Sequence, residues 1–375
     1  MSLRTSRMPQ EPLRRRSLTD ASVVTFGPLE PAALPALATP QRPGVPLTMW
    51  VRANGDLVRE QLHRHGAVLF RGFDEGADAL RPVVEAVGGD DALAYQDGAT
   101  PRSELGDGIY SSTEYPADQT IEMHNEACYS WSWPRVLGFA CALPSQTGGQ
   151  TPLADSRKVL RRLPADLVTR LERHGVSYVR NYTPGVGIPW RDALGCDESG
   201  LDAYAERTRV RVERVADDHL RTEAVRPAVA RHPDTGEWVW FNQATSFHLS
   251  TIGDELAAEV LGQVGPQRVP KTSRAGDGSE FTRAELDAIR AAIAAESTAF
   301  DWQRGDVLVV DNLLASHGRA PFTGEREIRV AMSAAANWQD VEARPAGAVT
   351  HTQVPAGAVT HTQDSTITQT NGERR

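Results

Sequence analysis

Short segments with the composition of buried β-strands recur along almost the whole chain, and they constrain the fold more than any other feature. Each segment is rich in β-branched and aromatic residues and is bounded by turn residues, a pattern typical of strands. Many short strands interrupted by helices predict a mainly β fold with a closed or double-sheet antiparallel architecture, for which a jelly roll is the natural candidate. The clearest segments are GAVLFRGF (66–73), Ile121 to Leu143, GDVLVVDN (305–312) and Glu327 to Ala336.

The middle of the chain is expected to fold as one domain. A length of 375 residues and a hydrophobic share of 40% allow a single large core. We expect this domain to cover residues 26–339 and to carry an insertion or lid at about 156–225. A helix is predicted at 282–297, because Thr282 followed three residues later by Glu285 has the capping-box pattern.

Both ends of the chain lack the pattern of packed elements. Residues 1–25 are polar and basic with no apolar stretch behind them, so they predict a disordered arm rather than a secretory signal. Residues 28–46 are rich in proline, which lacks a backbone donor, and predict an extended strap rather than a helix. The segment 340–375 predicts a disordered tail; it contains PAGAVTHTQ twice, at 345–353 and 355–363, which is too few copies for a solenoid.

Charge and cysteine content exclude several classes of protein. The net charge of −9 makes nucleic acid and anionic membranes poor partners. No stretch approaches the roughly 20 apolar residues that span a bilayer. The three cysteines, Cys128, Cys141 and Cys196, are odd in number and match no zinc spacing, so a reducing cytoplasm is expected. The sequence indicates no oligomeric state.

A histidine and a carboxylate lie two residues apart in the strand-like segment IEMHNEACYSW. Residues i and i+2 of a strand point to one face, so His124 and Glu126 can converge on one ion. The third ligand is expected to be His317, which follows a buried strand far downstream. Two histidines and one carboxylate leave three positions of an iron ion open, as Fe(II) oxygenases require. H-x-E alone is a short pattern that also arises by chance. The residues around it determine whether it indicates a metal site.

An arginine and a threonine near these residues suggest a site for a dicarboxylate. Arg326 follows the third candidate ligand after a predicted hairpin, and a guanidinium beside iron needs an anion. The distal carboxylate of 2-oxoglutarate fits that need, and the Thr151 hydroxyl could donate to the same group. The alternatives are a surface ion pair of Arg326 with Glu325 or Glu327, and an ordinary strand threonine. Arg329 is out of phase with Arg326 and is expected to point away.

Three long segments of the chain resemble the taurine dioxygenase (TauD/TfdA) family. They are MHNEACYSWSWPRVLGFACALPSQTGGQTPLADSRKV, RHPDTGEWVWFNQATSFH and WQRGDVLVVDNLLASHGRAPFTGEREIRVAM. Within the family they are most similar to the syringomycin-pathway aspartyl-hydroxylase-like branch found in antibiotic and siderophore gene clusters. The resemblance covers about residues 60 to 338.

The resemblance implies a double-stranded β-helix (jelly roll) enzyme that uses Fe(II), 2-oxoglutarate as co-substrate, and O2. At matched positions it implies iron ligation by His124, Glu126 and His317, and binding of the distal carboxylate of 2-oxoglutarate by Arg326 and Thr151. The carboxylate among the ligands implies hydroxylation, or desaturation, over chlorination, since halogenating members lack it.

The chain departs from the family pattern at one position. Sulfonate-handling relatives carry a second arginine four residues after the first, and here that position is Val330. A taurine-like substrate is therefore not expected. Pocket walls or lids are expected at 177–215 and 239–250, with structural packing as an equal alternative for each aromatic residue. The candidate substrate contacts are Tyr110, Met123, Trp240, Asn242, Phe247, His248 and Arg319.

The predicted activity is hydroxylation of an unactivated C–H bond of an amino acid or an amino-acid-derived intermediate in natural-product biosynthesis. The substrate is expected to be free or tethered to a peptidyl carrier protein. The alternatives are a catabolic dioxygenase of a small organic acid and a desaturase on the same scaffold. A zinc hydrolase is a weaker reading, because no H-E-x-x-H is present and hydrolysis gives Arg326 and Thr151 no role. A non-catalytic module on the same fold would have lost a ligand, and all three are present.

Overall fold

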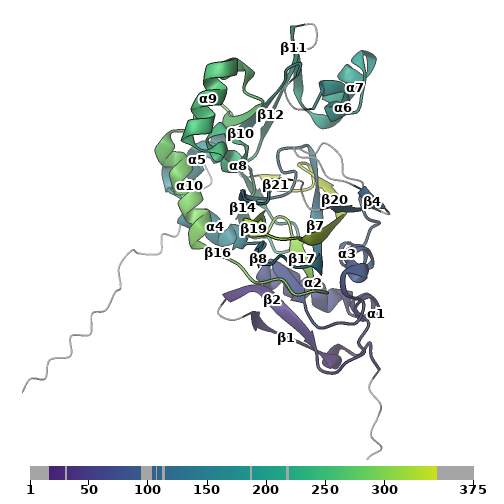
Figure 1. Ribbon diagram of the computed structural model, residues 1–375. Helices are drawn as coiled ribbons and strands as arrows, with labels where there is room; N and C mark the ends of the chain where they lie inside the picture. The colour runs from purple at the N-terminus through teal and green to yellow at the C-terminus, as the bar shows by residue number, and fades with distance from the viewer. Residues whose placement is uncertain are drawn as a thin grey trace, which may run out of the picture.

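Two facing β-sheets form the centre of the protein, with helices on the outer side of the larger one (Figure 1). The computed structural model of the protein describes residues 17–29, 32–93, 104–106, 108–111, 115–185, 188–216 and 219–343. The predicted mainly β class with helices is confirmed. No helix in those ranges is both long and apolar enough to cross a lipid bilayer.

The larger sheet has eight strands, and all its neighbours are antiparallel except β2 and β3. Its two longest strands, β7 and β20, pair along most of their length at its centre. In sheet order the strands are β1 (Val24–Leu29), β2 (Ala32–Pro40), β3 (Ala67–Phe70), β17 (Val307–Asp311), β7 (Ser132–Leu143), β20 (Glu327–Asn337), β5 (Ile109–Ser111) and β4 (Glu104–Gly106).

Alternation along the central strands explains how the sheet is covered on both faces. Val307 and Val309 of β17 pack into the cluster that holds the N-terminal helices, whereas Leu308 and Val310 pack into the cluster that holds the small sheet. All four are fully buried, as period-two alternation between two cores requires. The covering helices are α1 (Leu47–Ala53), α2 (Gly55–His65) and α3 (Leu80–Gly88), with the 3-10 turns η1 (Ala21–Val23) and η2 (Gly76–Ala79).

The small sheet faces the other side of β7, β17 and β20. Its residues Leu153 and Ala315 share one buried cluster with Phe139 and Val330 of the large sheet. A further two-stranded ladder of β8 (Thr147–Gly148) and β19 (Phe322–Thr323) lies beside it. In order, the strands of the small sheet are β16 (Ser297–Thr298), β9 (Leu153–Asp155), β18 (Ala315–Arg319) and β6 (Ile121–His124).

A third sheet, here called the insertion sheet, stands apart at the top of Figure 1. Its strands run in the order β11 (Arg211–Ala216), β12 (His219–Arg226), β10 (Val176–Tyr182) and β15 (Lys271–Ala275). The predicted insertion at 156–225 supplies three of them, but β15 comes from a later part of the chain. A smaller sheet joins β14 (Trp238–Trp240), β13 (Val229–Arg231) and β21 (Glu342–Ala343).

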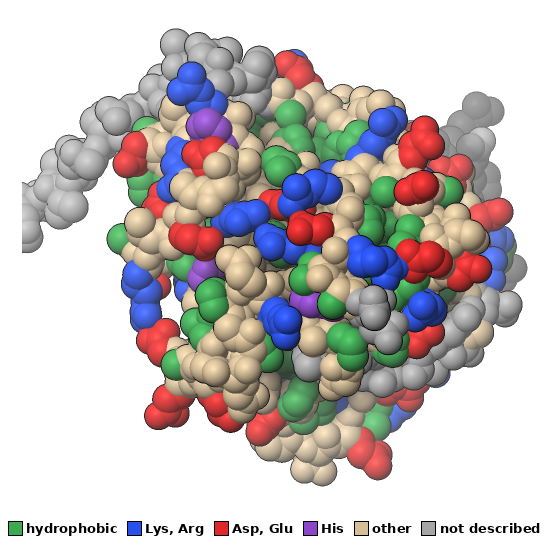
Figure 2. Space-filling view, turned by 90° about the horizontal axis from the view of Figure 1, so that it is seen from above, with side chains coloured by type: hydrophobic (Ala, Val, Ile, Leu, Met, Phe, Trp, Pro, Cys, Tyr) green, Lys and Arg blue, Asp and Glu red, His purple; other side chains and the backbone are tan. Residues whose placement is uncertain are grey.

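Helices surround the insertion sheet. Those before and within it are α4 (Ser156–Arg162), α5 (Ala165–His174), α6 (Trp190–Leu194), η3 (Glu198–Gly200) and α7 (Leu201–Thr208). Those after it are α8 (Ala244–Phe247), η4 (Leu249–Ile252), α9 (Asp254–Val264), η5 (Pro266–Arg268) and α10 (Arg283–Ala295). On the face seen from above, Lys and Arg side chains are interspersed with Asp and Glu (Figure 2).

Several expected elements are present with shifted bounds. The helix predicted at 282–297 is α10, and both hydrogen bonds of its capping box form, since Thr282 accepts from the Glu285 amide and Glu285 accepts from the Thr282 amide. The strand-like stretch from Ile121 to Leu143 splits into β6 and β7, because a turn separates them.

The terminal predictions differ from the structure at their inner edges. Residues 17–25 of the expected basic arm instead form η1 and the start of β1, because Val23 and Val24 are buried. The proline-rich strap at 28–46 is largely β2, a paired strand of the large sheet. Residues 342–343 of the expected tail instead form β21, which pairs with β13. Residues 1–16 and 344–375, with both PAGAVTHTQ copies, lie outside the described residues.

Helix α3 packs closely against Gly138 on β7. A Cβ built there would lie 2.2 Å from Cγ2 of Val84 and 2.7 Å from Cδ1 of Leu80. We expect Gly138→Ala to lower the free energy of unfolding by about 1–3 kcal/mol, because the core must be overpacked. Urea unfolding measures it. Gly262→Ala on α9 is the control, since its Cβ meets nothing within 4 Å. An unchanged unfolding midpoint for Gly138→Ala would show that α3 packs less tightly than described.

Candidate metal centre and its surroundings

Strand pairing within the small sheet brings two histidines together. In the antiparallel ladder of β6 and β18, His317 is the partner of His124, and directly opposed side chains project from the same face. Their rings lie 4.4 Å apart. The Nε2 atoms of His124 and His317 are 3.7 Å and 3.8 Å from Oε2 of Glu126. One ligand atom from each of the three residues lies within 4.8 Å of the others, a spacing that one ion can bridge.

The orientation of the two imidazoles is fixed by their surroundings. Nδ1 of His124 lies 2.8 Å from the backbone carbonyl of Glu122 and must donate to it, because a carbonyl only accepts. The lone pair of His124 is therefore on Nε2, the atom that faces Glu126, in the way that carbonyl partners orient metal-binding histidines. The ring of His317 is buried and packs 5.1 Å from that of Phe139.

Glu126 reaches the site from a turn and not from a strand. Strand β6 ends at His124, so strand alternation, on which the sequence argument rested, does not place the carboxylate. Instead, the side chain of Asn312 brackets the turn: its Oδ1 accepts from the Glu126 amide at 2.7 Å, and its Nδ2 donates to the Glu126 carbonyl at 2.9 Å. Nδ2 of the Asn125 side chain donates to the Asn312 backbone carbonyl at 2.6 Å.

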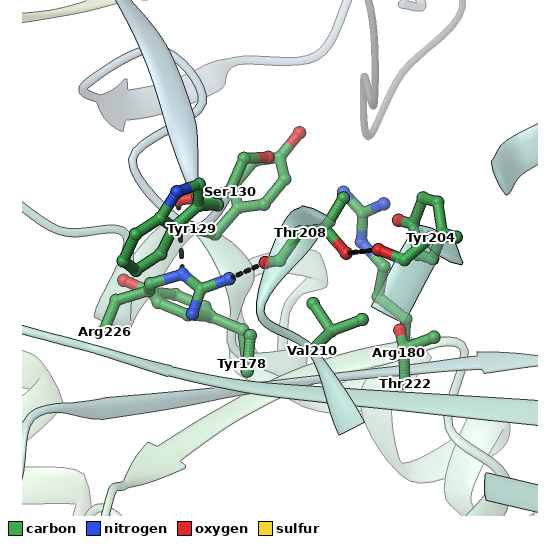
Figure 3. A pocket seen from close by; sticks show the side chains of 11 residues that line it. Tyr129, Ser130, Tyr178, Arg180, Tyr204, Thr208, Val210, Thr222 and Arg226 are labelled. Atoms are coloured by element: carbon green, nitrogen blue, oxygen red, sulfur yellow. Dashed lines mark hydrogen bonds between the residues drawn. The ribbon is translucent and has the colours of Figure 1, made fainter. Parts of the chain in front are cut away.

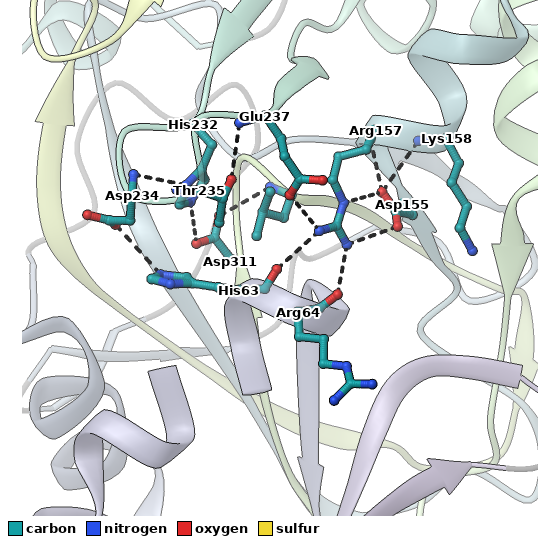
Figure 4. A network of polar contacts seen from close by, with 11 residues as sticks. His63, Arg64, Asp155, Arg157, Lys158, His232, Asp234, Thr235, Glu237 and Asp311 are labelled. Atoms are coloured by element: carbon teal, nitrogen blue, oxygen red, sulfur yellow. Dashed lines mark hydrogen bonds and ion pairs between the residues drawn. The ribbon is translucent and has the colours of Figure 1, made fainter. Parts of the chain in front are cut away.

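Asn312 is held in turn by a buried histidine–aspartate pair (Figure 4). Oδ1 of Asp311 accepts from the amides of Leu313 and Leu314, and Oδ2 lies 3.0 Å from Nε2 of His232. Burial opposes ionisation of Asp311, but the hydrogen bonds from His232 and the Leu314 amide outweigh it, and the pKa of Asp311 lies below its usual value. The turn that carries Asn312 is therefore tied to the core.

The same pair belongs to a second group of residues close enough to hold an ion, namely His63, His232 and Asp311. Nδ1 of His232 already accepts from the amides of Asp234 and Thr235, and its Nε2 faces Asp311. Both ring nitrogens are thus used by the protein itself. We assign this group a structural role and not a metal-binding one.

Two arginines, Arg319 and Arg326, line a cavity beside the three candidate ligands. Nε of Arg326 donates to the Gly149 carbonyl at 3.0 Å, which aligns the guanidinium. Burial, together with the neighbouring charge of Arg319, lowers the pKa of Arg326 to about 10, so it is still a cation at neutral pH. A guanidinium that lines a cavity offers a planar fork of donors to a carboxylate ligand. The cavity is lined by Ile121, His124, Phe139, Thr151, His317, Gly318, Arg319, Arg326 and Val330.

Thr151 lines the same cavity with its hydroxyl held in one orientation. Nε1 of Trp302 donates to Oγ1 of Thr151 at 3.2 Å. An indole N–H can only donate, so the hydroxyl proton of Thr151 is directed elsewhere and is available to a ligand. Arg329 lies outside the cavity and forms ion pairs with Asp78 and Glu327, in keeping with its expected orientation.

The donor set fits ferrous iron and a dicarboxylate. Two imidazole nitrogens and one carboxylate oxygen suit Fe(II), although they also suit zinc. The buried guanidinium and the oriented hydroxyl next to them match the needs of a second, anionic ligand, and a zinc hydrolase would leave both without a role. The geometry therefore favours the iron and 2-oxoglutarate pair over the zinc alternative.

The other predicted substrate contacts take up different positions. Arg319 lines the cavity, but its guanidinium donates to the carbonyls of Tyr115, Pro116 and Gln119 and so holds that loop. Tyr110 is buried opposite Val330 in the ladder of β5 and β20, within the core. Tyr110 therefore has a packing role in the core.

Residues from the predicted pocket wall at 239–250 pack against the insertion sheet. Asn242 is a structural residue, since it donates to the Ala228 carbonyl and accepts from the Ala244 amide. His248 accepts from the Ser250 amide at 3.1 Å, and burial, with the nearby Arg290, lowers its pKa. Neither lines the cavity beside the candidate ligands. Of the remaining three predicted contacts, Trp240 and Phe247 belong to one buried cluster, and Met123 packs against it.

Sequence reasoning missed the residues that position the site. Asn312 and Trp302 carry no motif of their own, and only the fold reveals their hydrogen bonds. The one available signal was Asn312 itself, a polar residue directly after a continuous apolar strand.

Comparisons with known proteins agree on one family. The profile described as "Taurine catabolism dioxygenase TauD, TfdA family" matches residues 27–332. The dapdiamide synthesis protein DdaC of Enterobacter agglomerans is 35% identical over 276 residues, which are 73% of this chain and 84% of that protein. A clavaminate synthase-like protein of Arabidopsis thaliana is 29% identical and covers 80% of this chain and 93% of its own length. The resemblance drawn from the motifs is confirmed.

Solved structures of similar shape also exist. A taurine dioxygenase from Burkholderia xenovorans superposes with a TM-score of 0.50 and 17% sequence identity, over 83% of this chain and 89% of that chain. At this identity the likeness concerns the fold alone.

The role of Asn312 can be tested by metal binding. Asn312→Ala removes both hydrogen bonds that fix the Glu126 turn. We expect the affinity for Mn(II), used as a stable substitute for Fe(II), to fall by about 10- to 100-fold, as for other supporting residues of metal sites. Calorimetric titration measures it, with Asn337→Ala, at the end of β20, as the control. Equal affinities in wild type and Asn312→Ala would contradict the role.

Proposed function

Because the chain belongs to the TauD/TfdA family of dioxygenases, we propose that it hydroxylates an unactivated C–H bond of an amino acid or an amino-acid-derived intermediate in natural-product biosynthesis. It is a non-haem dioxygenase that depends on Fe(II), 2-oxoglutarate and O2. The biosynthetic role is supported by the similarity to a protein named for dapdiamide synthesis. The expected class of enzyme and its cofactors are thereby confirmed.

The observation that carries the proposal is the meeting of two features at one place. Three candidate ligands, His124, Glu126 and His317, lie within bridging distance of one another, and the cavity beside them contains Arg326 and Thr151. We propose that the first three residues bind the ferrous ion. We propose that the last two bind the distal carboxylate of 2-oxoglutarate.

Bound together, the ferrous ion and 2-oxoglutarate supply O2-dependent oxidation of a C–H bond, coupled to decarboxylation of 2-oxoglutarate to succinate. The protein supplies position and exclusion of water. Arg326 forms a charge-assisted pair with the distal carboxylate, and Thr151, oriented by Trp302, donates to it. Phe139 and Val330 close the apolar side of the cavity.

The fold supports a jelly-roll assignment within the same proposal. The small sheet faces the large one across a shared apolar cluster. The two candidate histidine ligands lie on the small sheet, and Glu126 lies on the turn that follows β6. Two facing, mainly antiparallel sheets around a site between them are what a double-stranded β-helix requires. The three cysteines are free thiols, which supports the proposed cytoplasmic location.

Two residues bear on the reaction outcome. Glu126 completes a three-residue ligand set, which supports hydroxylation over halogenation; desaturation is the alternative outcome on the same set. Val330 occupies the position of the second arginine found in sulfonate-handling relatives and is 2% exposed within the core, which argues against a sulfonate substrate.

A coupled assay decides the substrate. The Fe(II)-loaded enzyme is incubated with 2-oxoglutarate and single amino acids, each supplied free and as the thioester of a peptidyl carrier protein. Succinate release matched by a product with one added oxygen atom identifies a hydroxylated substrate and its form. A product lacking two hydrogens would indicate desaturation, and coupled turnover only with non-amino-acid organic acids would favour the catabolic alternative.

Histidine variants distinguish the two groups that could hold an ion. We expect His317→Ala to abolish stoichiometric Mn(II) binding and all succinate release, since one of three ligands is lost. His63→Ala, from the second group, is expected to retain both. Calorimetry and a succinate assay measure them. The reverse result would move the metal to the His63 group and overturn the assignment.

Two arginines of one segment test the carboxylate site. We expect Arg326→Ala to raise the KM for 2-oxoglutarate by about 100-fold, because a buried charge-assisted pair is lost. Arg329→Ala is the control, since its guanidinium pairs with Asp78 outside the cavity. Initial-rate kinetics at varied 2-oxoglutarate concentrations give both values. Should Arg329→Ala have the larger effect, the proposed anchor is wrong.

A further inference from the structure

The inner face of the insertion sheet lies against the turn that carries the candidate ligands. The Tyr178 hydroxyl on β10 accepts from the Gln243 amide at 2.9 Å, and the Gln243 side chain donates to the Asn125 carbonyl at 2.7 Å. Asn125 stands between His124 and Glu126. Two hydrogen bonds therefore connect this face to the turn between two of the candidate ligands.

Two cations face each other on this inner side. In the antiparallel ladder of β10 and β15, Arg180 and Lys271 are direct partners, so their side chains leave the sheet next to each other. Like charges in that position are destabilising. Both also lie over the ring of Phe247, at 5.7 Å for the Arg180 guanidinium and 5.4 Å for the Lys271 ammonium.

Among the described residues, the Lys271 ammonium forms neither a hydrogen bond nor an ion pair. It lies over the ring of Phe247, 5.4 Å from the ring centroid. Burial and the neighbouring Arg180 lower the pKa of Lys271, and Glu122 offsets this only in part. The Glu122 carboxylate is itself engaged by Arg290 at 3.1 Å. A partly buried cation in this state is unfavourable until an anion joins it.

Arg226, on the neighbouring strand β12, has a structural role that serves as a comparison. Its guanidinium donates to the carbonyls of Ser130, Arg209 and Thr208, so its donors serve to join chain segments (Figure 3). Arg180 lines the same pocket beside aromatic side chains, 4.6 Å from the ring of Tyr129. The contrast with Arg226 distinguishes Lys271, whose ammonium joins no chain segments among the described residues.

We propose that Lys271 and Arg180 bind an anionic group of the substrate, a carboxylate or a phosphate, and that Tyr129, which lines one pocket with Arg180, contacts its apolar part. This inference rests on the proposed function, since it gives that enzyme's substrate a negative charge. The Arg180 guanidinium lies 4.6 Å from the Tyr129 ring, and Tyr129 follows Glu126 closely in the chain. The charge could belong to a free amino acid or to the phosphopantetheine arm of a carrier protein.

The first test measures anion binding without turnover. Wild-type protein is saturated with Mn(II) and 2-oxoglutarate, which fills the Arg326 site, and its thermal unfolding is followed while inorganic phosphate is added. We expect phosphate to raise the Tm of wild type and of Lys271→Arg but not of Lys271→Met. The exposed Lys158 on α4 provides the control, Lys158→Met, which should respond as wild type does. An equal response of Lys271→Met would overturn the proposal.

The ligand-free Tm gives a second, independent reading. Lys271→Met removes a cation that has no partner and repels Arg180. We therefore expect this variant to unfold at the same or a higher temperature than wild type when no anion is present. A clearly lower Tm, or failure to fold, would show that Lys271 stabilises the protein itself and would overturn the proposal.

The kinetic test separates the two sources of the charge. Succinate release is measured with free L-amino acids, their α-carboxamides and their phosphopantetheine thioesters. We expect Lys271→Met to raise the KM for the charged substrate by about 10- to 100-fold with little change in kcat. A preference for free acids over carboxamides assigns the charge to the carboxylate, and one for thioesters assigns it to the phosphate. Active wild type with an unchanged KM in Lys271→Met overturns the anion site alone, whereas wild type inactive throughout overturns the proposed function.

Discussion

The pairing of β6 with β18 is the constraint on which the site depends. It sets His124 opposite His317, so two residues separated by slightly more than half the chain have their rings in contact. A slip of one residue would turn one imidazole to the other face of the sheet. The register is held from both sides, because β18 also pairs with β9 and both strands are covered by the apolar cluster between the sheets.

Glu126 depends on a different kind of support. Its turn has no ladder to fix it, and the side chain of Asn312 takes the part that a neighbouring strand would play, with one acceptor and one donor for the Glu126 backbone. Asn312 is in turn fixed by Asp311 and the buried His232. A buried polar network is stable only when each of its donors and acceptors has a hydrogen-bond partner. Here the network holds the turn so that the carboxylate of Glu126 faces the two imidazoles.

The sequence predicts what local chemistry determines. Continuous apolar runs such as GDVLVVDN specify buried strands, and two histidines with a carboxylate specify a metal set; both expectations agree with the geometry. The sequence could not show that β6 ends before Glu126. The alternation of side-chain types that is typical of a strand continues in the sequence beyond His124, where the strand ends. Nor could the sequence distinguish Asn242, whose side chain bonds to backbone groups, from Lys271, whose ammonium forms no hydrogen bond or ion pair among the described residues. Partners brought together only by the fold, such as Trp302 and Thr151, leave no local trace.

The origin of β15 has a consequence for how this architecture can be recombined. The insertion sheet is assembled from two separate stretches of chain, and β15 from the later stretch covers one edge of β10. A cassette consisting of residues 156–225 alone, transplanted onto a related scaffold, would carry β10 with an open edge, which invites pairing between molecules. Exchange of specificity between homologues by such grafts therefore requires that both stretches move together as one module.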